Sequence, residues 1–73
     1  MTNHPNRSKS ALDRIESGSF AEACFNQNSI AELEQALSEG VDETDCDTWG
    51  ISAGEWRGQI RLALAAKREV ASA

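Results

Sequence analysis

Four short motifs that start helices constrain the fold of this chain more than any other feature. The pattern Ser-x-x-acid occurs at Ser10–Asp13, Ser19–Glu22, Ser29–Glu32 and Ser52–Glu55. At a helix start the serine oxygen accepts the backbone N–H of the third helical residue, and the acid reaches back to the N–H of the serine. One match is weak evidence, because serine and glutamate are common. Four matches that each precede an apolar pattern predict an all-helical chain.

The apolar periodicity after these motifs sets the expected helices and their buried faces. We expect helices over residues 11–16, 20–27, 30–39 and 53–71, because apolar residues recur there at helical spacing. The side chains expected to face the core are Leu12, Ile15, Phe20, Cys24, Ile30, Leu33, Leu37, Trp56, Ile60, Ala63, Leu64 and Val70. No alternating pattern typical of strands occurs.

The remaining segments complete the predicted organisation. Residues 1–9 are polar and are expected to form a disordered tail, and residues 41–50 are expected to form an acidic loop before the long last helix. We therefore predict an all-α fold, a small three- to four-helix bundle in a single domain over residues 10–73. A chain of 73 residues buries only roughly 60% of its unfolded surface, so a partner or self-association would steady this thin core.

The charge of the chain is segregated along the sequence. Residues 16–55 contain ten acidic residues and no Lys or Arg, whereas all seven basic residues lie before or after this block. Such a field governs encounter and choice of partner rather than fold. We expect one compact anionic surface with an aromatic anchor at its centre, made by Glu32, Glu39, Asp42, Glu43, Asp45, Asp47 and Trp49. Its natural counterpart is a basic groove that normally holds nucleic acid; the alternative is a solvated face without a partner.

Three arginines form a narrow basic stripe beside the apolar face of the last expected helix: Arg57, Arg61 and Arg68. They would either contact phosphates or pair with the acidic half of the same domain, and we expect the second. Ten nearby acids would repel a nucleic-acid backbone, which argues against direct nucleic-acid binding. A helix-turn-helix over residues 20–39 would turn glutamates toward the phosphates, which argues against that motif as well.

No residue pattern indicates a catalytic, metal or cofactor site. His4 is the single histidine and lies in the expected tail, where no packing would hold it as a base. The acidic loop does not match a calcium-binding EF-hand, because Trp49 falls at ligand position 5 when Asp45 and Asp47 take positions 1 and 3. Cys46 has no second thiol or histidine at zinc-ligand spacing. We therefore expect a non-enzymatic protein without a metal or cofactor.

The two cysteines, Cys24 and Cys46, could form one bridge but are expected to remain thiols. The first twenty residues contain no apolar stretch of signal-peptide length, and no segment approaches the roughly 20 apolar residues of a membrane span. We expect a cytoplasmic location and no membrane contact, and the cytoplasm keeps thiols reduced. Cys24 is expected to be buried as a small hydrophobic residue.

The opening of the chain carries one resemblance to known proteins. Residues 4–9 read His-Pro-Asn-Arg-Ser-Lys, which is similar to the start of many small proteins of bacterial phages and other mobile elements. The likeness covers these six residues and implies a short accessory protein that acts inside a bacterial host cell. Anti-CRISPR and anti-restriction inhibitors occur in that setting, and several of them look like DNA to their targets. Such inhibitors share no common motif, so no functional residue is transferred.

These patterns lead to one functional hypothesis and one rival. The leading hypothesis is a non-enzymatic, anti-CRISPR-like inhibitor that docks its anionic surface on the nucleic-acid-binding site of a host defence complex. Trp49 would supply an aromatic anchor if it is not part of the core. The rival is a regulatory or antitoxin-like helical module that forms a homodimer through the face of Trp56, Ile60 and Leu64.

Overall fold

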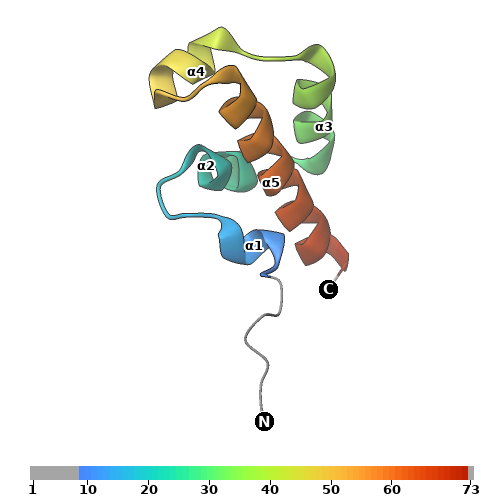
Figure 1. Ribbon diagram of the computed structural model, residues 1–73. Coiled ribbons are helices and arrows are strands. Elements are labelled where there is room, and N and C mark those ends of the chain that lie inside the picture. The colour runs from blue at the N-terminus through green and yellow to red at the C-terminus, as the bar shows by residue number, and fades with distance from the viewer. Residues whose placement is uncertain (1–8, 73) are drawn as a thin grey trace.

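One long helix organises the computed structural model, which describes residues 9–72. The helices are α1 (Ala11–Arg14), α2 (Phe20–Gln27), α3 (Ile30–Glu39), α4 (Glu43–Trp49) and α5 (Ala53–Ser72). Helix α5 runs through the middle of the molecule, and the other four pack against it (Figure 1). The predicted all-α class is confirmed, with five helices in the described range rather than three or four. Of the expected tail, residues 1–8 lie outside the described residues.

Each of the four Ser-x-x-acid motifs begins a helix, as predicted. The serine Oγ accepts the backbone N–H three residues later at 3.1 or 3.2 Å in all four cases. At Ser29 the capping box is complete, because Glu32 Oε1 accepts the N–H of Ser29 at 2.8 Å. Glu22 Oε1 instead accepts the N–H of Gly18 at 2.6 Å, which closes the turn leading into α2. Local sequence therefore determines where these helices start.

The segment that was expected to be an acidic loop, residues 41–50, contains helix α4. Asp42 Oδ1 accepts the backbone N–H groups of Thr44 and Asp45 at 2.9 and 3.2 Å, so aspartate acts here as serine does at the other helix starts. Gly50 follows the helix with φ of 65°, a left-handed conformation that ends helices and favours glycine. The prediction of a loop was wrong, because the acidic residues include the N-cap of a short helix.

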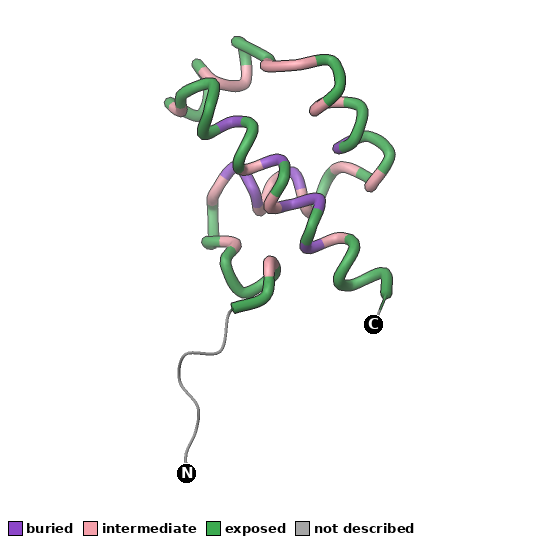
Figure 2. The backbone as a smooth tube through the Cα atoms, turned by 45° about the vertical axis from the view of Figure 1, so that its right-hand side comes forward, coloured by how far each residue is buried: buried purple, intermediate pink, exposed green. Residues whose placement is uncertain are grey.

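The hydrophobic core lies where α2 and α3 meet the middle of α5 (Figure 2). Its buried side chains are Phe20, Ala21, Cys24, Leu33, Trp56, Ile60, Ala63, Leu64 and Ala66. Seven of these were predicted from periodicity, and the two added alanines are small residues beside them. Trp56 is the largest and is only 2% exposed. Among residues 9–72 no helix combines the length and apolar character needed to cross a bilayer.

Helix α1 departs from the prediction in length and in burial. It ends at Arg14 rather than at residue 16, because Ile15 is already extended and the chain turns at Gly18 with φ of 78°. Leu12, expected in the core, is 44% exposed. The helix is held by its backbone instead, since the carboxylate of Glu69 accepts the N–H of Ala11 at 2.8 Å. Helix α1 is therefore anchored to α5 by a cap supplied from a distant part of the chain.

Helix α5 ends one residue beyond its predicted end, and none of the described residues covers the far end of its apolar face. Val70 is 51% exposed, although it lies on the same face as the buried Trp56 and Leu64. Val70 lines an open groove together with Phe25 and Ile30, and no side chain of residues 9–72 buries it. The expected burial of Val70 was wrong, and Ile15, Ile30 and Leu37 are only half-buried.

Candidate functional site

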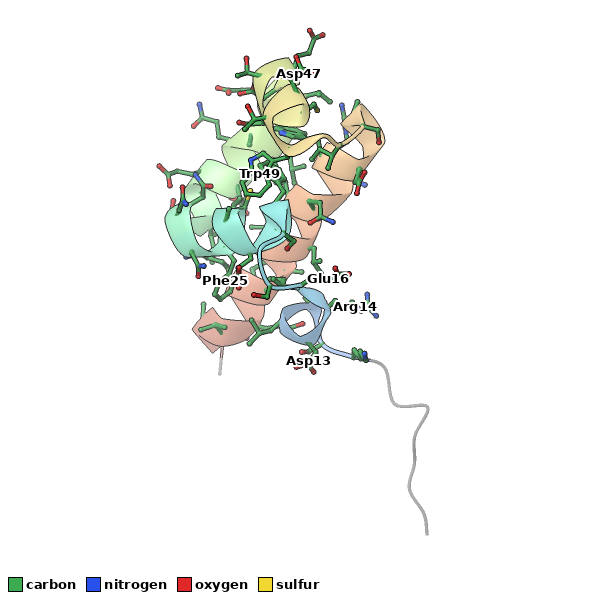
Figure 3. All side chains as sticks on the ribbon, turned by 90° about the vertical axis from the view of Figure 1, so that its left-hand side faces the viewer. Asp13, Arg14, Glu16, Phe25, Asp47 and Trp49 are labelled. Atoms are coloured by element: carbon green, nitrogen blue, oxygen red, sulfur yellow. The ribbon has the colours of Figure 1, made fainter. Side chains whose placement is uncertain are left out.

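The predicted contact residues come from α3, from the connection that follows it and from α4. The structure brings three of them together, because Glu32, Asp45 and Trp49 line one pocket of about 230 Å³ between α2, α3 and α4. Helix α4, which carries Asp47, lies at the opposite end of the molecule from Asp13 in α1 (Figure 3). The other predicted acids do not line this pocket: Glu39 is the last residue of α3, Asp42 is the N-cap of α4, and Glu43 and Asp47 lie on α4. We call the six acids and Trp49 the acidic surface.

The carboxylates of the acidic surface divide into two groups. Three have bonds within the fold: Glu32 and Asp42 cap helices, and Glu39 Oε2 accepts the side-chain amide of Gln35 at 2.8 Å. The others, Glu43, Asp45 and Asp47, accept no side-chain or backbone hydrogen bond from any described residue. The second group is available to a partner without loss of a structural bond. Sequence reasoning did not separate the two groups, because it treated residues 41–50 as a loop.

Ion pairs among the described residues neutralise little of the negative charge. Within residues 9–72 one ion pair forms, between Arg68 and Glu34, and both side chains are exposed. Pairing of the basic stripe with the acidic half, which we expected, is thus found for Arg68 and not for Arg57 or Arg61. None of the six acids of the acidic surface takes part in it. An exposed pair of this kind adds roughly 0–1 kcal/mol to stability, and it involves only one of the ten acids of residues 16–55.

Trp49 is both a contact of the core and an exposed aromatic surface. Its ring centroid lies 5.5 Å from that of Phe20, with the planes tilted by 57°, and the side chain is still 41% exposed. It also forms a wall shared by two pockets, one on the side of Glu32 and Asp45 and one on the side of Glu16. A tryptophan held on one face by a phenylalanine presents its other surface with little conformational freedom. Such residues are typical anchors of interfaces.

The cysteines have the environment of structural thiols. Both are free, with Cys24 buried as predicted and Cys46 half-buried. Burial raises the pKa of Cys24 to about 11, and the charge of Asp45 adds to the effect. Burial also raises the pKa of Cys46, helped by the carboxylates of Asp47 and Asp42. Both groups stay protonated near neutral pH, whereas a nucleophilic cysteine needs the thiolate.

Other kinds of site find little support in the described residues. No group of three or more His, Cys, Asp and Glu side chains in residues 9–72 is arranged to hold a metal ion. His4 lies outside that range. The face of Trp56, Ile60 and Leu64, which the rival hypothesis uses for dimerisation, is buried in the chain's own core. A search of protein-family models, curated proteins and solved structures found no match.

Proposed function

We propose that this protein is a non-enzymatic, anti-CRISPR-like inhibitor that docks its acidic surface on the nucleic-acid-binding site of a host defence complex. One observation carries the proposal: three carboxylates on one short helix, Glu43, Asp45 and Asp47, have no hydrogen-bond or ion-pair partner among residues 9–72. They lie beside the caps and the exposed Trp49 that complete the acidic surface. The phage-like opening of the chain supports a bacterial host as the setting.

Electrostatics favours a basic partner for such a surface. Carboxylates that are unpaired in the free protein gain attraction on binding without first breaking an internal pair. A basic groove built for a nucleic-acid backbone supplies many positive charges at comparable spacing. Long-range attraction speeds the encounter, and packed anchors such as Trp49 slow release. The mechanism is steric and electrostatic occlusion of the groove, which requires no chemistry from the inhibitor.

The test compares two charge reversals of equal size at opposite ends of the molecule. Asp47→Lys changes the acidic surface and leaves the Asp42 cap intact, so α4 keeps its N-terminal hydrogen bonds. Asp13→Lys makes the same change of charge on α1, far from that surface (Figure 3). Reversal of Asp42 itself would be uninformative, because loss of an N-cap costs about 1 kcal/mol of helix stability. Circular dichroism confirms that both variants are folded.

The assay measures displacement of labelled target DNA from purified, guide-loaded CRISPR effector complexes of several types. We expect the wild type and Asp13→Lys to displace DNA from at least one complex with similar potency. Asp47→Lys should lose roughly tenfold or more in potency, because reversal turns an attraction into a repulsion at the same contact. Failure of the wild type to displace DNA from any complex would overturn the proposal. Equal potency of the two variants would also reject the acidic surface as the contact.

A further inference from the structure

A second depression lies on the other side of Trp49, and its remaining lining residues are outside the predicted set of site residues. It has a volume of about 290 Å³ and is bounded by the turn before α2, the end of α4 and the first turns of α5. Figure 3 looks onto this side of the molecule, with Trp49 above and Glu16 and Arg14 below. Glu16 and Glu55 both line it, although they are far apart in the sequence. Sequence reasoning missed the depression, because only the fold brings these segments together.

The polar groups that line the depression divide into those bonded within the fold and those without a partner among the described residues. Gln59 Oε1 accepts the backbone N–H of Ala21 at 3.0 Å, and the N–H of Gly18 donates to Glu22. The carboxylates of Glu16 and Glu55 are exposed and have no hydrogen-bond or ion-pair partner among the described residues. Carboxylates are acceptors only, so an occupant that satisfies them must be a donor. Two carboxylates against one arginine also leave the lining with a negative balance.

The apolar part of the depression selects the shape of that donor. Trp49 and Phe20 form an aromatic wall, with ring centroids 5.5 Å apart, and Leu62 lines the side formed by α5. A guanidinium is planar, stacks on aromatic rings and donates to two carboxylates at once, whereas an ammonium is a compact charge with strong hydration. We propose that this depression binds an arginine side chain of a partner protein, stacked on Trp49 and bonded to Glu16 and Glu55.

Arg14 provides a way to test whether the occupant of the depression is positively or negatively charged. It lines the same depression and is the one positively charged residue there among residues 9–72. For an arginine occupant, Arg14 is a like charge that weakens binding, so its removal should tighten the site. For an anionic occupant, Arg14 would be the main attraction and its removal would weaken binding. The variant Arg14→Gln therefore separates the two kinds of ligand.

The inference rests on the proposed function to the extent that the arginine belongs to the same basic partner that the acidic surface contacts. Its test uses a free ligand, N-acetyl-arginine amide, and does not require the partner. Failure of this test would leave occlusion by the acidic surface intact. Failure of DNA displacement would leave a measured arginine pocket whose partner is of another kind.

The experiment is a titration of isotope-labelled protein followed by nuclear magnetic resonance at roughly 0.15 M salt, where the Debye length is about 8 Å. We expect saturable shifts at the indole N–H of Trp49 and at the backbone N–H of Gly18. N-acetyl-lysine amide should bind roughly two- to fivefold more weakly, because it stacks less well on the ring. Arg14→Gln should tighten arginine binding about twofold, by removing a like charge at close range.

Two double variants that each lose two negative charges show where the arginine ligand binds. Glu16→Gln with Glu55→Gln should weaken binding roughly fivefold or more, since charge-assisted hydrogen bonds become neutral ones. Glu43→Gln with Asp47→Asn, on the acidic surface, should leave the affinity for N-acetyl-arginine amide within about twofold of the wild type at this ionic strength. The proposal is overturned by shifts that do not saturate, by equal affinity for lysine, or by equal effects of the two double variants. Weaker binding to Arg14→Gln would overturn it as well.

Discussion

Trp56 offers the sharpest test of how this small core is held together. It is 2% exposed and contacts a core formed by α2, α3 and α5, yet its indole Nε1–H has no acceptor among residues 9–72. The side chain therefore contributes a large apolar burial and carries one buried, unpaired donor. Two substitutions separate these contributions. Trp56→Ala removes both, whereas Trp56→Phe removes the donor and keeps most of the aromatic burial.

The expected magnitudes differ enough to be measured. A stability of about 0.05–0.15 kcal/mol per residue corresponds to roughly 4–11 kcal/mol for a domain of this size. Trp56→Ala should cost about 3–5 kcal/mol, which is a large part of that total. Trp56→Phe loses about 1–2 kcal/mol of apolar burial, but removal of an unpaired buried donor returns about 1–3 kcal/mol. The net effect of Trp56→Phe should therefore lie between a loss of about 1 kcal/mol and a gain of about 2 kcal/mol in unfolding free energy.

The assay is guanidinium unfolding of both variants, followed by far-ultraviolet circular dichroism because the substitutions change tryptophan fluorescence. Equal m-values would show that the two variants unfold from comparable states. A loss of more than about 2 kcal/mol for Trp56→Phe would refute the reasoning, because it would mean that the N–H is satisfied in the folded protein. The variant also leaves Trp49 as the only tryptophan, so its indole resonance and fluorescence are assigned without ambiguity.

Three further predictions concern the caps and the buried thiol. Asp42→Ala should cost about 1 kcal/mol in guanidinium unfolding and Asp42→Ser much less, because serine also caps the helix; equal costs would contradict the capping role. Glu69→Ala should speed hydrogen exchange at Ala11, the residue whose N–H it accepts at 2.8 Å, and should leave exchange in the core unchanged. The pKa of Cys24 is raised from 9.0 in the unfolded chain to about 11 in the folded one. Its contribution to the free energy of unfolding is therefore fully present below pH 9 and is lost as the pH rises towards 11. Cys24 should lower the unfolding free energy by about 1 kcal/mol at pH 10 relative to pH 8. Cys24→Ala should remove this contribution and leave only the part from other groups such as Cys46, whose pKa is also raised.

Much of the fold was predictable because its helix starts depend on local chemistry. A serine side chain satisfies an N–H three residues away, and that bond needs no tertiary context. Helix α4 was missed although Asp42, Asp45 and Gly50 supply the same kind of cap and stop. The segment was predicted to be a loop because it contains so many acidic residues.

Burial was predicted less well than helix position, for a geometric reason. Periodicity tells which side chains share a face, as it did for Trp56 and Leu64, but not how far neighbouring helices extend along that face. Val70 shares the face and remains exposed beside an open groove. Similarly, the sequence indicated a concentration of acids but not which carboxylates cap helices. It gave no sign that Glu16 and Glu55 line one depression, because that proximity depends on the packing of the turn before α2 against α5.

The central claim is that a basic partner contacts the carboxylates on α4 when it binds this protein. The most direct measurement is the association rate of each variant with an effector complex from which the wild type displaces DNA. Asp47→Lys should associate roughly tenfold more slowly than the wild type, while Asp13→Lys should stay within about twofold, and the difference should shrink as salt is raised. Equal rates for the two variants, or a difference that salt does not change, would contradict the claim.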